Sequence, residues 1–305
     1  MSLLFLSCAA APDPALERAR RLVAQMTLDE KLKMLQGNQA HKGGYTGVVD
    51  GVPRLGVPDL RMNDGPQGFR APNNAPGTST QWPSGLTVAH SWDVFNFGAY
   101  GNALGDEFHR KGANVLFGPA VNVARIANGG RSFEYLSGED PFLGFSLVQP
   151  IVAGIQAHGV IANVKHYIDN NQEGLINKTD SEPTPAGPMA HMYKYRGKVN
   201  REWEAGPTGL GDRHGTSAEI DERTQMQLYW PPFEGAIAAK ALSAMCANNL
   251  INGVYACESN ATMNTLLRAR GGFGGWTCSD YDGTRSTVGA ALHGLDIAMP
   301  GTVPC

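Results

Sequence analysis

The sequence predicts an α/β protein built on a (β/α)₈ barrel that is incomplete at its C-terminal end. Three observations lead to this fold class. Short apolar segments alternate with amphipathic ones along 305 residues, which is enough chain for one barrel domain of ~250 residues. Polar side chains follow several of the apolar segments directly. One segment, Trp276-Thr277-Cys278, runs into Ser279-Asp280, and the end of a barrel strand is the usual place for a catalytic carboxylate.

The individual elements follow from the hydrophobic pattern. We expect strands at residues 59–63, 86–89, 115–121, 160–166, 242–248, 276–279 and 295–299. Between them we expect helices at residues 93–110, 143–158, 222–239, 259–270 and 284–292. Strands that alternate with helices favour a parallel sheet. One barrel strand stays unassigned, and the sequence stops at Cys305, where a closing helix would follow.

Two helices are expected ahead of the first strand. Asp13-Pro14 begins one of them, because proline is favoured at the first helical position. Thr27 and Glu30 have the spacing of a capping box and begin the other.

The composition argues against two classes of partner. The net charge is −3 with 17% charged residues, and there is no basic stripe that would indicate nucleic-acid binding. No apolar run approaches the ~20 residues of a membrane span. Among five cysteines, Cys246 and Cys257 flank a turn and could pair. No cysteine spacing suits zinc, so we expect neither a metal nor a cofactor.

Weaker features favour a secreted, extracellular protein. Residues 1–11 are apolar and small and resemble the end of a signal peptide. They lack a positive region, so a disordered start is the alternative. Asn177 and Asn260 begin sequons, which matter only after secretion. Residues 174–211 have no periodicity and are too long for an ordinary loop.

Candidate functional residues follow the predicted strands. The loops after barrel strands converge on one pocket, and carboxylates, cations and imidazoles in such a pocket suit the hydroxyls of a sugar. A broad aromatic side chain, Tyr281 or Trp82, could pack against a sugar face. The polar residues in question are Asp64, Arg70, Arg125, Arg131, Glu139, Asp140, Lys165, His166, Asn248, Asn249 and Asp280.

Each candidate also has a purely structural interpretation. Asp64 could have no role beyond forming a turn, and Arg131 could make a surface salt bridge. The Lys-His pair at residues 165–166 could be a satisfied pair at the rim. The acidic residues 139–140 could begin a helix, and Asp280 could cap the helix predicted at residue 284.

An ordered set of motifs connects these residues to a known family. The chain contains, in order, Asp64, Gly-Pro-Ala-Val-Asn-Val-Ala-Arg125, Gly-Arg131-Ser-Phe-Glu-Tyr, Gly-Glu-Asp140-Pro, Val-Lys165-His166-Tyr, Asp221-Glu-Arg-Thr224, Pro231-Pro-Phe-Glu234, Ser279-Asp280-Tyr and Gly294-Leu-Asp-Ile-Ala-Met-Pro-Gly301. From about Ala15 to Gly301 it resembles the N-terminal catalytic barrel of glycoside hydrolase family 3, in its β-glucosidase branch.

The resemblance implies an activity and a set of roles. The expected reaction is hydrolysis of terminal β-D-glucosyl residues from glucosides or oligosaccharides by a retaining mechanism with two carboxyl groups. Asp280 would be the nucleophile. The residues implied to bind the sugar are Asp64, Arg70, Arg131, Lys165, His166, Arg213, Tyr281 and Asn248.

Two departures from the family pattern stand out. Asn248 occupies the position where the family usually has a Tyr that contacts the nucleophile. Residues 174–211 separate Asn170-Asn171-Gln172-Glu173 from Arg213, and removing them restores the family spacing. We therefore expect this segment to be an insertion, which untranslated sequence carried into the gene model would explain.

The second carboxyl group is the open question of the mechanism. In this branch a Glu of a C-terminal sandwich domain supplies it, and the sequence ends before such a domain, so we expect the acid/base to lie outside this chain. The N-acetylglucosaminidase branch has Phe-Pro-Gly-His-Gly after Lys-His, and the xylosidase branch has Ser-Asp-Cys at the nucleophile. Tyr167-Ile168-Asp169 and Tyr281 favour the glucosidase over both. The alternatives are a non-catalytic sugar-binding remnant and a chain that does not fold stably.

Overall fold

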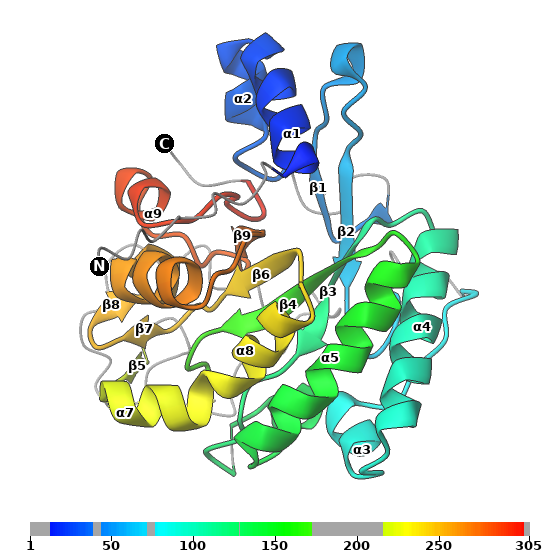
Figure 1. Ribbon diagram of the computed structural model, residues 1–305, viewed down its shortest axis with the longest axis vertical. Coiled ribbons are helices and arrows are strands. Elements are labelled where there is room, and N and C mark those ends of the chain that lie inside the picture. The colour runs from blue at the N-terminus through cyan, green and yellow to red at the C-terminus, as the bar shows by residue number, and fades with distance from the viewer. Residues whose placement is uncertain (1–12, 39–43, 72–76, 128, 173–215, 302–305) are drawn as a thin grey trace, which may run out of the picture.

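A curled sheet of mostly parallel strands forms the centre of the molecule (Figure 1). The computed structural model describes residues 13–38, 44–71, 77–127, 129–172 and 216–301. The strands lie in the order β1-β2-β3-β4-β6-β9. β1 runs antiparallel to β2, and every other neighbouring pair in this sheet is parallel. Their bounds are β1 Gly47–Val49, β2 Leu60–Asp64, β3 Val115–Ala120, β4 Ile161–Tyr167, β6 Ser243–Cys246 and β9 Trp276–Ser279.

Three helices cover one face of this sheet. α5 (Pro141–Ala157) lies between α4 (Val94–Arg110) and α8 (Pro231–Ala238) in Figure 1. Asp93 and Asp140 begin α4 and α5 by accepting hydrogen bonds from the backbone N–H groups two residues on. Gly101 lets the two helices pack closely, because a Cβ there would lie 2.6 Å from the carbonyl oxygen of Ile151.

The sheet is an incomplete barrel, and two extended segments bridge its open side. Ile297 forms a parallel bridge with Cys278 of β9, and Ala298 forms one with Gln36. The N–H of Asn38 donates to the carbonyl of Val48 in β1, 2.6 Å away. The strand expected at residues 295–299 is therefore reduced to single bridges, and the barrel-like fold class is confirmed.

One predicted element was wrong, and another is shorter than predicted. Residues 86–89 lie in a helix, α3 (Gly85–Ala89), because the hydroxyl of Ser84 accepts the N–H of Thr87 and caps the first turn. The helix expected from residue 284 is α9 (Val288–Leu292) and starts four residues later. β1 was not predicted from the sequence, because its three residues are too few to show a hydrophobic period.

The remaining elements are short or distorted. The helix expected at residues 222–239 is divided into α7 (Glu222–Thr224), a π-helical stretch (Gln225–Tyr229) and α8, and a second π-helical stretch spans Ala261–Arg270. A small sheet joins β5 (Ser217–Ala218), β7 (Leu250–Ile251) and β8 (Val254–Tyr255). Short 3-10 turns span Pro53–Leu55, Ser132–Glu134 and Ala256–Glu258. Cys246 and Cys257 form a disulfide, as their positions around the turn predicted.

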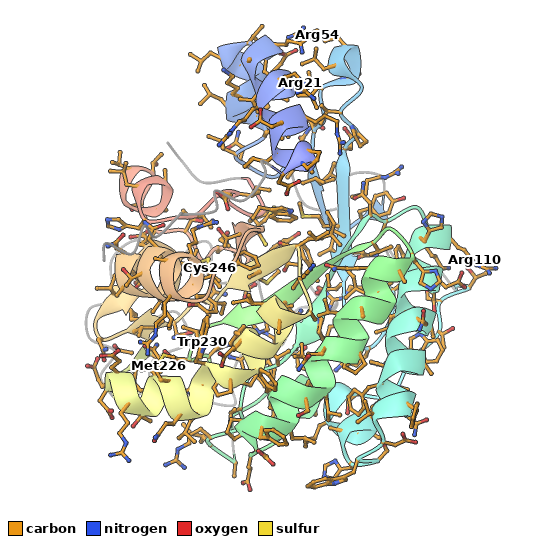
Figure 2. All side chains as sticks on the ribbon, in the orientation of Figure 1. Arg21, Arg54, Arg110, Met226, Trp230 and Cys246 are labelled. Carbon is orange, nitrogen blue, oxygen red and sulfur yellow. A yellow bond between two sulfur atoms is a disulfide. The ribbon has the colours of Figure 1, made fainter. Side chains whose placement is uncertain are left out.

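The N-terminal helices form as the sequence predicts. Asp13 caps α1 (Pro14–Gln25), and the full capping box of Thr27 and Glu30 begins α2 (Leu28–Lys33). Arg54, at the tip of the connection between β1 and β2, reaches this pair of helices (Figure 2). Its guanidinium lies 2.6 Å from the carboxylate of Glu30, which ties the tip of that connection to α2.

Three expectations lie outside the described residues: the signal-like segment 1–11, the insertion 174–211, and the position of Arg213. Within the part of the chain that the structure describes, no helix is long and apolar enough to cross a membrane.

Candidate active site

A cavity of about 580 Å³ opens at the carboxyl ends of the strands. β2, β4 and β9 each deliver polar residues to it at or near their carboxyl ends, as expected for parallel strands in a barrel. The lining residues are Thr46, Asp64, Gly65, Pro66, Gln67, Gly68, Phe69, Arg70, Ser79, Thr80, Gln81, Phe117, Arg131, Phe133, Glu134, Lys165, His166, Met245, Asp280 and Tyr281.

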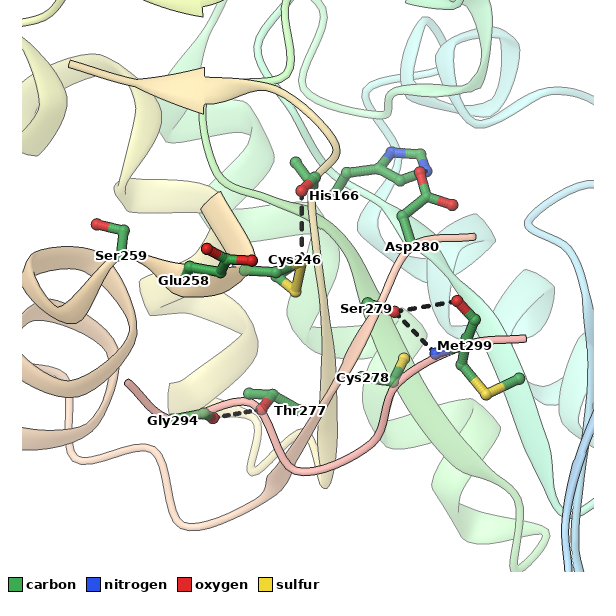
Figure 3. The surroundings of a disulfide bond; sticks show 12 residues. His166, Cys246, Glu258, Ser259, Thr277, Cys278, Ser279, Asp280, Gly294 and Met299 are labelled. Atoms are coloured by element: carbon green, nitrogen blue, oxygen red, sulfur yellow. Dashed lines mark hydrogen bonds and ion pairs between the residues drawn. A yellow bond between two sulfur atoms is a disulfide. The ribbon is translucent and has the colours of Figure 1, made fainter. Parts of the chain in front are cut away.

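Asp280 is held in a defined orientation at the end of β9. Its backbone N–H donates to the carbonyl of Cys246 at 2.9 Å, so the neighbouring strand β6 fixes its main chain. Its Oδ1 accepts the N–H of Tyr281 at 2.7 Å. Its Oδ2 lies 3.8 Å from Nε2 of His166, and Figure 3 shows the imidazole facing this carboxylate. Only 10% of the Asp280 side chain is exposed.

The last residue of β9, Ser279, is hydrogen-bonded to the backbone of Met299 in the segment that follows α9. The hydroxyl of Ser279 accepts the N–H of Met299 at 2.8 Å and lies 3.3 Å from its carbonyl oxygen (Figure 3). Asp280 does not cap a helix at residue 284, because α9 begins only at Val288. The structural interpretation of Asp280 as a helix cap was therefore wrong.

Asp64 is a second acidic residue in the cavity lining and is surrounded by cationic side chains. Its Oδ1 lies 3.2 Å from Nζ of Lys165, and its Oδ2 lies 3.1 Å from the guanidinium of Arg70. Burial by itself would raise the pKa of Asp64. The charges of Lys165, Arg70 and Arg131 outweigh that effect and hold the pKa below its usual value. Asp64 is therefore an ionised hydrogen-bond acceptor at neutral pH.

Arg131 and Glu134 form a further ion pair on the wall of the cavity. Both side chains come from the 3-10 turn Ser132–Glu134 and the residue before it. Glu134 is buried and contacts Nε of Arg131, and both residues line the cavity. Arg131 is thus partly buried in the site, which contradicts the interpretation of it as a surface salt-bridge partner.

Tyr281 is part of the cavity lining, while its hydroxyl bonds to the backbone. The ring is buried next to Asp280, and the hydroxyl donates to the backbone carbonyl of Thr46. Burial raises the pKa of Tyr281 well above its usual value. This residue therefore offers an aromatic surface with a neutral, already bonded hydroxyl.

Among the described residues, six other candidates are not part of the cavity lining: Trp82, Arg125, Glu139, Asp140, Asn248 and Asn249. Asn248 is 1% exposed, and neither polar atom of its side chain has a hydrogen-bond partner among the described residues. Trp82 donates its indole N–H to Glu107 and packs edge-on against Tyr100. Arg213 lies outside the described residues. The acidic residues 139–140 begin a helix, because the Asp140 carboxylate caps α5.

Some residues that shape the site were assigned no role from the sequence. Glu134 and Tyr135 stand in the motif around Arg131 but look like ordinary polar and aromatic residues there. Tyr135 bonds His166 through its hydroxyl, and Asn122 bonds the backbone of His166. The two partners of each contact are 31 and 44 residues apart in the sequence, and no local sequence pattern indicates such contacts. Across the described ranges, no group of three or more His, Cys, Asp or Glu side chains could hold a metal ion.

The fold and the cavity together define a barrel of the (β/α)₈ type whose strand ends carry an acidic residue among cations. A family model described as the N-terminal domain of glycosyl hydrolase family 3 matches residues 52–194. The chain is therefore similar to the N-terminal domain of glycoside hydrolase family 3.

Relatives and solved structures agree with this assignment. Beta-glucosidase A of Aspergillus kawachii is 37% identical over 290 residues, which are 95% of this chain and 30% of that protein. The crystal structure of DesR, a beta-glucosidase from Streptomyces venezuelae in complex with D-glucose, has a TM-score of 0.76 and 32% identity and covers 94% of this chain. Beta-glucosidase 3B of Thermotoga neapolitana in complex with glucose has a TM-score of 0.77, at 28% identity, over 93% of this chain. The chain spans 32% and 37% of these two structures.

Proposed function

We propose that the protein hydrolyses terminal β-D-glucosyl residues from glucosides or oligosaccharides, with Asp280 as the nucleophile of a retaining mechanism. One observation carries the proposal. The carboxylate at the end of β9 and the ion-paired carboxylate at the end of β2 line one cavity together with Lys165 and His166. The names of the relatives, which are beta-glucosidases, support the same substrate class.

The polar groups of the cavity suit a non-reducing glucosyl ring. Asp64 is ionised and can accept hydrogen bonds from two neighbouring hydroxyls. Lys165 and Arg70, which already contact it, are donors to the oxygens of the same hydroxyls. The face of Tyr281 provides an apolar surface against which one face of the sugar can pack.

In the first chemical step, an Asp280 oxygen forms a bond to the anomeric carbon while the bond from that carbon to the leaving oxygen breaks. The leaving oxygen takes the bonding electron pair and must gain a proton. In the second step, water attacks the same carbon, gives up a proton to the group that protonated the leaving oxygen, and displaces the Asp280 carboxylate, so the sugar is released with its original configuration. The N–H of Tyr281 donates to Asp280 Oδ1, which holds the carboxylate in a fixed orientation.

The proton for the leaving oxygen needs a carboxyl group with a raised pKa. Two further acidic side chains line the cavity, Asp64 and Glu134, and each is paired with an arginine. The pKa of Asp64 is lowered by its neighbouring cations, and the Glu134 carboxylate already accepts from Nε of Arg131, so neither suits the role. We propose that the general acid comes from residues outside the described part of the chain.

The decisive experiment uses a substrate whose leaving group needs no proton. The chain is incubated with 2,4-dinitrophenyl 2-deoxy-2-fluoro-β-D-glucoside, and the adduct is located by intact mass and peptide mapping. We expect one fluoroglucosyl group on Asp280 and none in Asp280→Asn. Asp282→Asn is the matched control, because Asp282 lies two residues away and outside the cavity lining. Glucose binding without any adduct would instead favour the sugar-binding remnant.

We also propose that the protein works in an oxidising, extracellular environment. The disulfide between Cys246 and Cys257 supports this location, because structural disulfides persist mainly outside the reducing cytosol. Fractionation of the producing cells tests it: recovery of the protein in the culture medium with this disulfide intact is expected, and recovery only from the cytosol would contradict it.

A further inference from the structure

Asn260 begins a sequon, Asn260-Ala-Thr262, that the candidate active site does not use. An Asn-x-Thr triplet without proline in the middle is the acceptor sequence for N-linked glycans in secreted proteins. Asn260 is exposed and directly precedes the π-helical stretch Ala261–Arg270. It closely follows Cys257, whose disulfide with Cys246 is typical of the same secretory environment. The motif, its exposure and the nearby disulfide therefore agree.

The hydrogen bonds around Asn260 leave the atom that would carry a glycan directed away from its neighbour. Nδ2 of Asn264 donates to the carbonyl oxygen of Leu292, 3.3 Å away. Since a carbonyl oxygen only accepts, that Asn264 atom is the amide nitrogen. The Asn260 atom 2.9 Å from it must accept in turn and is therefore Oδ1. Nδ2 of Asn260 lies on the other side of its amide, and no described residue takes a hydrogen bond from it.

We propose that Asn260 is an N-glycosylation site whose glycan covers an exposed apolar face of α9. The proposal rests on the proposed extracellular location, because this modification takes place in the secretory pathway. The donor is a lipid-linked oligosaccharide diphosphate. Nδ2 of Asn260 forms a bond to the anomeric carbon of the first N-acetylglucosamine and gives up one proton. The bond from that carbon to the diphosphate breaks, and the diphosphate leaves with the electron pair.

The position of Thr262 decides when the glycan must be added. The transferring enzyme needs the Thr hydroxyl of the sequon, but Thr262 is 3% exposed and its hydroxyl donates to the carbonyl of Ser259. Its own carbonyl accepts from the buried Tyr167, so the residue is part of the folded core. Modification therefore precedes folding. Detergent-opened microsomes should modify the reduced, unfolded chain and not the folded one, and equal modification of both would contradict this order.

The glycan would lie beside apolar side chains that are exposed to water. Val288 and Leu292 are 68% and 70% exposed, and their spacing of four residues puts them on one face of α9. The hydrogen bonds of Asn264 to Asn260 and to Leu292 place the sequon at the C-terminal end of α9, which lies next to the π-helical stretch in Figure 1. A bulky, hydrophilic glycan here shields the apolar pair from other molecules.

The site is tested in the full chain, secreted from yeast behind a cleavable signal. The glycan is removed with peptide N-glycosidase in H₂¹⁸O, which converts the modified Asn to an isotope-labelled Asp. Peptide mapping then separates Asn260 from the second sequon at Asn177. We expect the isotope at residue 260, and an unmodified Asn260 in the secreted protein would overturn the proposal.

Variants of the sequon separate its recognition from folding. Thr262→Ser keeps the hydroxyl and should stay modified. Thr262→Val keeps the shape without the hydroxyl and should lose the glycan, so a glycan that persists there would contradict the proposal. Asn264→Gln is the matched control, because Asn264 contacts Asn260 but does not begin a sequon, and it should stay modified.

Binding of the apolar dye ANS measures the cover over α9. Asn260→Gln should bind about twofold more ANS than the glycosylated wild type, and adding Leu292→Gln should reverse that gain. Equal binding with and without the glycan would refute the cover. A glycan on a chain that is never labelled at Asp280 would uphold the site and refute the glucosidase. A glycosylated yeast product from a chain that its own cells keep in the cytosol would refute only the extracellular location.

Discussion

The ammonium of Lys165 lies 3.2 Å from the carboxylate of Asp64, joining the ends of two strands that are not neighbours in the sheet. Only 5% of the lysine side chain is exposed. Asp64 belongs to β2 and Lys165 to β4, with β3 between them. The ion pair therefore links the carboxyl ends of β2 and β4 at the edge of the cavity, across the intervening strand β3.

Replacing Lys165 with Met should destabilise the protein by about 3 kcal/mol, near the lower end of the cost of breaking a buried pair. The loss is limited because Arg70 still contacts the other oxygen of Asp64. Urea unfolding at pH 7 measures it. Lys33→Met, which breaks the exposed pair with Asp29, should leave the unfolding free energy unchanged. Equal losses in both variants would contradict the importance of the buried pair.

The cost of Lys165→Met should also depend on pH. Because the folded-state pKa of Asp64 is lowered, the pair contributes its full stability above the unfolded-state pKa of about 3.9. That contribution is lost as the pH falls through the folded-state pKa. The difference in unfolding free energy between wild type and variant should therefore shrink in acid.

Asp169 should destabilise the protein as the pH rises. Burial raises its pKa to about 7, against a weaker opposing effect of the hydrogen bond from Gln225. The folded protein then keeps a proton that the unfolded chain has released, so stability present near pH 4 is lost as the pH rises toward and past 7, by at most ~4 kcal/mol. Asp169→Asn should therefore be more stable than wild type at pH 8 and similar near pH 4, by thermal unfolding.

Asparagine suits the backbone at this position. Asp169 has a φ of 63°, a left-handed conformation that Asn tolerates well. Asp282, with a φ of 59°, gives a control in which the same substitution should change stability little at either pH. A gain at pH 8 that is equally large at pH 4 would show that ionisation is not the cause.

Reduction of the disulfide between Cys246 and Cys257 should lower stability by about 3 kcal/mol, the chain-entropy estimate for a loop closed over 11 residues. Because the Cys246 carbonyl also accepts the N–H of Asp280, labelling of Asp280 should slow as well. Thermal unfolding and labelling with and without dithiothreitol measure both effects. A Cys246→Ala/Cys257→Ala variant should not respond to the reductant, and a further response would point to another thiol.

Asn248→Leu should be neutral or stabilising by up to about 2 kcal/mol, because it removes a buried polar group whose two polar atoms lack partners in the described structure. Labelling of Asp280 should stay within about twofold of wild type, since the residue does not line the cavity. A large loss of labelling with an unchanged melting temperature would restore the substrate-binding role predicted from the family pattern.

The barrel class could be predicted because its strands alternate with helices and because Asp280 directly follows the last residue of β9. β9 occupies the predicted range, residues 276–279. Residues 86–89 misled the prediction because their apolar character is the same in a strand and in a buried helical turn. The capping hydroxyl of Ser84, which decides between them, is a weaker signal than hydrophobicity.

The candidate site could be predicted only in part, because motifs identify residues and not the directions of their side chains. The sequence places Tyr281 beside Asp280, but only the fold brings its hydroxyl to Thr46, 235 residues earlier. Tyr135 likewise meets His166 across 31 residues. Contacts of this kind depend on how the strand ends converge, which no local pattern encodes.

The bridge between Gln36 and Ala298 has a consequence during protein synthesis. The segment around Gln36 leaves the ribosome early, yet its bridging partner is made more than two hundred residues later. Until residues 297 and 298 are made, the backbone N–H and C=O groups that they bond on β9 and around Gln36 lack these partners. Exposed strand edges of this kind can pair with strands of other chains. We therefore expect the nascent chain of this protein to be more prone to aggregation before Met299 has emerged from the ribosome than after it.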